Sequence, residues 1–154
     1  GLGNYCDFWM HNGLMEDADG KLSKSRGERI TLEEVFEECP PAALRFYLLS
    51  HHYREFTPYS PEGLLEACQE GERLGINAVD CMIVDSTDPR DDAEIFQLVS
   101  RFEEALADDL DTPKALDVLR DLDKIAETRL KNEGDIGPIS GMYSIFQRVL
   151  GVFS

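Results

Sequence analysis

The fold is decided by residues 92–131, which read DAEIFQLVSRFEEALADDLDTPKALDVLRDLDKIAETRLK. Apolar residues recur there every three or four positions, which is the spacing of one face of an α-helix. Asp-Thr-Pro at 111–113 interrupts the pattern and restarts it, because Asp or Thr caps a helix and Pro is tolerated in its first turn. The stretch therefore predicts two amphipathic helices joined by a short polar turn. Their apolar positions are Ile95, Leu98, Val99, Phe102, Leu106, Leu116, Leu119, Leu122, Ile125 and Ala126.

Similar start and stop signals lie on both sides of this stretch. Thr31 and Glu34 have the spacing of a capping box, which predicts a short helix ending near residue 38. Pro40-Pro41 ends that helix and begins one over 41–52, and Ser60-Pro61 begins another. Glycines over 134–141 are expected to end the preceding helix before a last helix begins. The apolar residues of these helices that are expected to be buried are Leu44, Tyr47, Leu48, Leu64, Leu65, Cys68, Leu74, Tyr143, Phe146, Val149 and Leu150. Phe96, in the stretch 92–131, is also expected in the core.

Strand signals are nearly absent from the sequence, and residues 1–30 are Gly-rich and loop-like. We therefore predict a mainly α fold, in which a loop with short strand remnants precedes an antiparallel helix bundle. Apolar residues make up 42% of the 154 positions, enough to bury a core and exclude global disorder. The 31 acidic residues outnumber 15 basic ones and give a net charge of −16, which argues against autonomous nucleic-acid binding. Such acidity is also what a salt-adapted organism would produce.

Cysteine usage and apolar runs indicate the compartment. No run approaches the roughly 18 apolar residues of a membrane span, and no basic-then-apolar leader is visible. Because the chain opens with Gly1-Leu2-Gly3 rather than Met, we expect a fragment or a processed chain. The cysteines at 6, 39, 68 and 81 form no CxxC pair and, with three His, complete no zinc pattern. We expect reduced, singly packed cysteines in the cytoplasm and no metal site in this chain.

The stretch that carries chemistry is DGKLSKSRG at 19–27. Lys21 and Lys24 are three residues apart, Ser23 and Ser25 supply hydroxyls, and flanking glycines allow unusual backbone conformations. Such a loop can close over polyphosphate, where lysines neutralise developing charge and hydroxyls donate hydrogen bonds. Adenylate formation requires this, because charge builds on the phosphate oxygens as pyrophosphate leaves. The alternative is a solvated turn rich in Lys and Ser.

The context of this stretch resembles one family. KLSKS resembles the KMSKS signature of class I aminoacyl-tRNA synthetases, with Leu22 in place of Met. WMHNG at 9–13 and ALRFYLLSHHYR at 43–54 look like the cysteinyl-tRNA synthetase versions of the segments on either side. FEEALADDLDTPKA at 102–115 resembles the start of that family's DALR-type helical domain. The resemblance runs from about residue 5 to the end of the chain.

This resemblance implies an aminoacyl-tRNA ligase that activates cysteine with ATP and Mg²⁺ and transfers it to tRNA(Cys), in the cytoplasm and without a membrane. Lys21 and Lys24 are then catalytic. Trp9 is expected to be a packing anchor under the signature loop. The residues expected to bind ATP are Lys21, Ser23, Lys24 and Ser25 in the loop and, near the adenosine, His11 and Gly13.

The resemblance also implies a division of the chain into three parts. Residues 1–30 would end the catalytic domain, residues 31–85 would contact the tRNA stem, and residues 91–154 would form the DALR-type bundle. The family's HIGH-type motif and zinc site lie upstream of WMHNG. Zn²⁺ is therefore expected in the complete enzyme with its ligands outside this chain, and the chain alone is expected to be inactive.

Two other functions remain open at this point. A mycothiol-type cysteine ligase resembles the same family and joins cysteine to an amino sugar. In such a ligase, adding tRNA would not increase ATP–pyrophosphate exchange. A non-catalytic helical module that binds tRNA or protein is the third interpretation.

Three charged groups also have two interpretations each. Residues 51–54 are expected to end a helix, where cationic side chains interact favourably with the negative end of the helix dipole. The alternative for Arg54 is a contact with tRNA. The aspartates at 108, 109 and 111 are expected to be a solvated, capped helix end rather than a divalent-cation site. Lys124, Arg129 and Lys131 are expected to be helix-end charges, with weak tRNA contact as the alternative.

Overall fold

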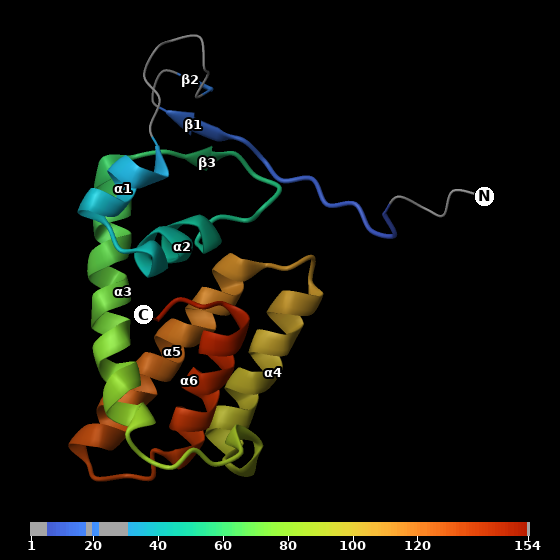
Figure 1. Ribbon diagram of the computed structural model, residues 1–154. Coiled ribbons are helices and arrows are strands. Elements are labelled where there is room, and N and C mark those ends of the chain that lie inside the picture. Colours follow the sequence, from blue (N-terminus) through green and yellow to red (C-terminus); the bar gives the residue numbers. More distant parts are fainter. Residues whose placement is uncertain (1–5, 18–19, 22–30, 154) are drawn as a thin grey trace.

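Helices dominate the computed structural model, which describes residues 6–17, 20–21 and 31–153 (Figure 1). The mainly α prediction is therefore confirmed. Within those residues, no helix is both long and apolar enough to cross a membrane. The helices are α1 (Leu32–Glu38), α2 (Pro41–Leu49), α3 (Pro61–Met82), α4 (Ala93–Ala107), α5 (Thr112–Lys131) and α6 (Gly137–Val149), and a short 3-10 helix spans Pro89–Asp91.

Cap residues begin three of these helices where the sequence predicts them. The side chains of Thr31, Ser60 and Asp111 each accept a hydrogen bond from the backbone N–H three residues further on. At Thr31 the capping box is complete, because the Glu34 carboxylate also accepts the Thr31 N–H at 2.8 Å. Each cap satisfies donors that the first helical turn leaves without partners, so these starts are fixed locally.

Three short strands form a small sheet at one end of the molecule (Figure 1). They are β1 (Met15–Asp17), β2 (Gly20–Lys21) and β3 (Thr57–Pro58), in the order β2-β1-β3. β1 and β2 are antiparallel with Glu16 opposite Lys21, whereas β1 and β3 are parallel with Met15 opposite Thr57. The sheet thereby joins the first residue of the KLSKS stretch to a segment that lies between α2 and α3.

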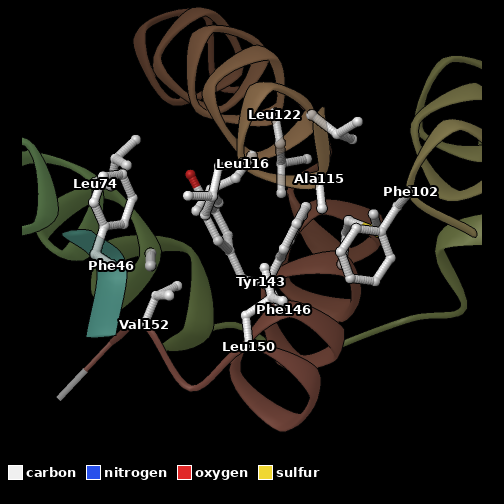
Figure 2. Close-up of a cluster of buried hydrophobic side chains, with 14 of the residues drawn as sticks. Phe46, Leu74, Phe102, Ala115, Leu116, Leu122, Tyr143, Phe146, Leu150 and Val152 are labelled. Atoms are coloured by element: carbon white, nitrogen blue, oxygen red, sulfur yellow. The ribbon is translucent and has the colours of Figure 1, made fainter. Parts of the chain in front are cut away.

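The core lies where α6 meets its neighbours (Figure 2). Tyr143 and Phe146 of α6 are fully buried, and the Phe146 ring meets that of Phe102 edge-on at 4.6 Å. Leu74 of α3 and Leu122 of α5 complete the same cluster from the other sides. Each such side chain contributes about 1.5–3 kcal/mol by leaving water. The helices are therefore held by one continuous apolar core.

Adjacent apolar pairs account for several errors in the predicted core. Leu48, Leu65, Phe96 and Val149 are exposed, with Leu65 at 58%, although the sequence analysis placed them inside. In each case a neighbouring residue is buried instead. Successive helical residues point about 100° apart, so one member of such a pair faces water when the core covers a narrow stripe. The buried neighbours are Tyr47, Leu64, Ile95 and Leu150.

Two predicted helix boundaries are also wrong. α2 ends at Leu49 rather than at residue 52. The predicted break over 134–141 ends early, because α6 begins at Gly137 and includes Gly141. A Cβ on Gly141 would lie 2.2 Å from the carbonyl oxygen of Thr87. This glycine therefore allows the chain before α4 to approach the helix closely and does not end it.

One buried carboxylate ties three helices together. Asp123 of α5 is only 1% exposed and forms an ion pair with Arg73 of α3. Its other oxygen accepts hydrogen bonds from the Asn77 amide at 2.8 Å and the Tyr143 hydroxyl at 3.4 Å. Burial, together with this carboxylate, raises the pKa of Tyr143 far above its ordinary value. Both oxygens of the Asp123 carboxylate have partners, so this buried group fixes α3, α5 and α6 relative to one another.

Candidate functional site

The candidate site is the base of the KLSKS stretch. Lys21 lies in β2, where its backbone pairs with Glu16 of β1. Ser23, Lys24 and Ser25 lie outside the described residues, as does the rest of 22–30. The described chain resumes at Thr31, whose capping box fixes the start of α1. Regular structure thus lies on both sides of residues 22–30, with strand pairing before them and a helix cap after them.

Gly13 has a steric reason to be glycine. A Cβ at this position would lie 1.8 Å from the carbonyl oxygen of Glu55, which no side chain permits. The Gly13 N–H donates to the carbonyl oxygen of Tyr53 at 2.6 Å. His11, two residues earlier, is exposed. The structure therefore places Gly13 in the contact between the WMHNG segment and the chain after α2, and leaves His11 open to solvent.

Backbone bonds continue this contact along the sheet. The Thr57 N–H donates to Leu14 at 3.0 Å, and the Tyr59 N–H donates to Glu16 at 2.5 Å. The Tyr47 hydroxyl of α2 donates to the carbonyl oxygen of Pro58, and burial raises the pKa of that phenol. β3 is therefore held by α2 on one side and by β1 on the other, which positions the start of the signature stretch.

An ion-pair cluster that the sequence analysis missed joins this region to the bundle. Asp109, in the turn between α4 and α5, accepts hydrogen bonds from Arg54 Nε at 2.5 Å and Arg54 Nη2 at 2.9 Å. The Tyr53 hydroxyl donates to the same carboxylate at 2.7 Å. These donors hold the pKa of Asp109 well below its usual range. We call Tyr53, Arg54 and Asp109 the Asp109 clamp.

The clamp changes the interpretation of two predicted features. Arg54 does not act as a helix-end cation, because α2 ends five residues earlier and the guanidinium binds a carboxylate. Within the aspartate cluster, Lys114 pairs with Asp108 at 3.1 Å and with Asp111 at 2.8 Å. Asp111 therefore caps a helix as expected, whereas Asp109 also binds Arg54 and Tyr53, which the prediction did not include. No local pattern could reveal a pair that is 55 residues apart.

A cleft of about 420 Å³ lies beside the clamp. Its lining comes from the WMHNG segment and β1, from the end of α2, and from the turn after α4. Apolar side chains dominate that lining, including Met10, Leu48 and Leu110. Across this cleft the strand-bearing segment faces the turn after α4, and the clamp joins that turn to the chain after α2.

All four cysteines are free thiols, as expected, but Trp9 and two of the cysteines depart from prediction. Trp9 is 71% exposed, so it is no buried anchor among the described residues. Cys39 and Cys68 are not packed singly: their sulfurs lie 2.8 Å apart, with Cys68 donating, and both are buried. Burial and the Cys68 thiol raise the pKa of Cys39 to about 12. In the described ranges, no group of three His, Cys, Asp or Glu side chains could hold a metal ion.

The predicted basic cluster late in α5 is neutralised by neighbours. Arg129 pairs with Asp92 at 2.8 Å and with Glu94 at 2.7 Å. Lys124 pairs with Asp121 at 2.9 Å, and Lys131 lies 3.5 Å from a carboxylate one turn earlier. These cations support the bundle, so they do not form an unpaired basic patch for nucleic acid.

Comparison with known families agrees with this geometry. Residues 2–69 match the family described as tRNA synthetases class I (C) catalytic domain, and residues 101–154 match the DALR domain. The first match includes the sheet and the signature stretch, and the second includes the end of α4 and all of α5 and α6. They define the class as a class I tRNA synthetase.

Curated relatives indicate which family within this class the chain resembles. A cysteine–tRNA ligase of Parvibaculum lavamentivorans is 41% identical over 79% of this chain and 25% of its own length. Those of Staphylococcus carnosus and Pelobacter propionicus are 33% and 32% identical, covering 96% and 98% of this chain. The chain belongs to the cysteine–tRNA ligase family. It spans 25% to 36% of the length of these relatives.

Proposed function

We propose that the protein to which this chain belongs activates cysteine with ATP and ligates it to tRNA(Cys). One observation carries the proposal: the KLSKS stretch begins in a strand over Gly20–Lys21, and the described chain resumes at a helix cap on Thr31. The family matches on both sides of the clamp support it. In this proposal, residues 1–30 end the catalytic domain and carry the loop that closes over ATP, residues 31–85 contact the tRNA stem, and residues 91–154 form the DALR-type bundle.

The signature stretch supplies charge and hydrogen-bond donors. Lys21 and Lys24 are the catalytic cations, since adenylate formation develops negative charge on phosphate oxygens that ammonium groups stabilise. Ser23 and Ser25 donate hydroxyl hydrogen bonds to the same oxygens. Cations engaged mainly in the transition state raise kcat rather than only the affinity for ATP. His11 and Gly13 belong to the segment near the adenosine, and Gly13 acts through its backbone contact with Tyr53.

Mg²⁺ and Zn²⁺ have different places in the proposal. Mg²⁺ accompanies ATP and neutralises phosphate charge, which fits the oxygen ligands that ATP itself brings. Zn²⁺ would select the cysteine thiolate, but the described residues contain no converging set of three ligands. No step is therefore assigned to zinc in this chain. Its ligands are expected elsewhere in the complete protein.

The decisive experiment is Lys24→Ala in the complete protein. We expect cysteine-dependent ATP–pyrophosphate exchange to fall roughly 10²-fold, as for loss of one transition-state donor. The matched control is Lys131→Ala, which removes an exposed lysine at the far end of α5 and should leave exchange unchanged. Exchange at the normal rate in Lys24→Ala would contradict the role of the loop. Charging of tRNA(Cys) by the unchanged protein separates the synthetase from a ligase that acts on an amino sugar.

A further inference from the structure

The Asp109 clamp is the starting point, because its geometry is costly and specific. Asp109 has φ of 55° and Leu110 has φ of 56°, a left-handed conformation that non-glycine residues rarely adopt. Asp and Asn tolerate it better than other residues. The turn is tightened by backbone bonds from Asp111 to Ala105 at 2.9 Å and from Leu110 to Leu106 at 3.3 Å. The Asp109 carboxylate is thereby presented outward from the bundle.

The neighbouring aspartates of the turn act within the bundle. Asp108 and Asp111 both pair with Lys114, and Asp111 also caps α5. Asp109 instead reaches Tyr53 and Arg54, which are 56 and 55 residues away in sequence. The two Arg54 donors give bidentate geometry, which fixes orientation as well as distance. The Arg54 guanidinium also lies 5.0 Å from the centre of the Tyr53 ring, so the two partners support one another.

A continuous set of contacts leads from the clamp to the signature stretch. The Tyr53 carbonyl oxygen accepts the Gly13 N–H, and β3 beyond it pairs with β1. β1 in turn pairs with β2, where Glu16 lies opposite Lys21. Beside this route the cleft of about 420 Å³ separates the strand segment from the bundle. The clamp therefore adds a second link between the strand segment and the bundle, beside the packing of α2 into the core.

We propose that Asp109 is a positioning residue for adenylate formation: through Arg54 and Tyr53 it holds the WMHNG strand, and with it Lys21, at a fixed place relative to the helical bundle. The inference rests on the proposed function, and it names a residue of the bundle that acts on the ATP loop. A displacement of about 1 Å at reacting groups can lower a rate by as much as 10²-fold. The clamp would thus let the bundle set the position of β2, which contains Lys21.

The test compares Asp109→Asn with Asp108→Asn in the complete protein. Asn tolerates the left-handed turn and keeps the size of the side chain, so it removes chiefly the charge that binds Arg54. We expect Asp109→Asn to lower kcat of cysteine-dependent pyrophosphate exchange about tenfold, with KM for ATP changed less than about twofold. Asp108→Asn, which loses only a contact with Lys114, should keep the normal kcat.

A double-mutant cycle adds a second criterion. Arg54→Gln should lower kcat as much as Asp109→Asn does, and the double variant should be no worse than either one, because all three remove the same link. Additive losses would show that the two residues act separately and would overturn the clamp. Equal losses in Asp108→Asn and Asp109→Asn would assign the effect to the fold of the turn and would also overturn it.

Hydrogen exchange on the 154-residue chain gives a readout that does not depend on activity. In Asp109→Asn the amides of Gly13, Thr57 and Tyr59 should exchange faster, while amides of α5 and α6 stay protected. Unchanged exchange at these amides, or faster exchange with normal kcat in the complete protein, would overturn the proposal. Absence of any pyrophosphate exchange in the unmodified complete protein would instead contradict the proposed function, and the amides would still report on the clamp.

Discussion

The helical bundle of α4–α6 and the strand-bearing segment before α1 are held by different kinds of contact. The bundle buries whole side chains, with Leu122 and Phe146 fully inaccessible to water. The strand segment leaves Phe8 90% exposed and is attached by backbone hydrogen bonds to the chain after α2, which the Asp109 clamp joins to the bundle. A dense core resists deformation, whereas a few polar links can shift at small cost. The bundle is thus suited to be a platform, and the segment to be positioned upon it.

The largest expected effect tests the platform itself. Phe146→Ala removes a fully buried ring that contacts Phe102, and we expect a loss of about 3–5 kcal/mol in the free energy of unfolding. Phe96→Ala makes the same chemical change at an exposed position of α4 and should cost under about 1 kcal/mol. Urea unfolding of the chain, followed by circular dichroism, measures both. Similar losses in the two variants would show that the core is not centred on α6.

The second prediction concerns the attachment of the strand segment. Gly13→Ala places a methyl group where the Glu55 carbonyl oxygen lies, so the backbone must separate. Overpacking costs about 1–3 kcal/mol, which corresponds to roughly fivefold or more in local opening. We expect the amides of Thr57 and Tyr59 to exchange at least that much faster, with the unfolding midpoint of the bundle unchanged. A lower midpoint would mean that the two regions unfold together, contrary to the comparison.

The sequence predicted local features better than contacts between distant residues. Helix starts at Thr31, Ser60 and Asp111 were predictable, because a cap, its partner and a following proline or glutamate lie within a few residues. The exposure of Leu65 and Phe96 was not, since periodicity does not define the width of the buried stripe.

The candidate site shows the same limit. The KLSKS stretch and Gly13 could be chosen from motifs, but the reason for glycine at 13 is a carbonyl oxygen that lies 42 residues away in sequence. The Cys39–Cys68 contact and the Asp109 clamp join residues 29 and 55 apart, and no spacing rule predicts them. Gly141 was assigned to a break for a related reason, because only the packed structure brings Thr87 to it. Tertiary contact therefore decided what local pattern could not.

The third prediction contrasts two arginine-bound carboxylates. Asp92 caps α4 through the amides of Glu94 and Ile95 and also binds Arg129, so Asp92→Ala should cost about 2 kcal/mol in unfolding free energy. Asp109 binds Arg54 at an exposed site outside the core, and Asp109→Asn should leave the unfolding midpoint unchanged. Thermal unfolding compares the two variants. An equal fall in both would show that the clamp also stabilises the bundle.

Two ion pairs predict how stability depends on pH: Asp92 with Arg129 at 2.8 Å, and Glu70 of α3 with Arg120 of α5 at 2.6 Å. The Arg129 guanidinium lowers the pKa of Asp92, and the Arg120 guanidinium lowers that of Glu70. A carboxylate whose pKa is lower in the folded state contributes fully above its ordinary pKa and loses that contribution as the pH falls through the lowered value. Stability should therefore decrease as the pH falls from about 5 through the lowered pKa values, and less steeply in Asp92→Asn. If unfolding free energy fell equally steeply with pH in the unchanged chain and in Asp92→Asn, this assignment would be contradicted.

The smallest expected effect has the opposite sign. Gly71 lies inside α3, and a Cβ there would meet nothing within 4 Å, in contrast to Gly13. Alanine restricts the unfolded chain and favours the helix, so Gly71→Ala should raise the free energy of unfolding by about 0.5–1 kcal/mol. Two glycines with opposite responses would show that space, and not residue type, decides their roles. A destabilised Gly71→Ala would mean that α3 needs flexibility at this point, and the platform would then be less rigid than its core packing indicates.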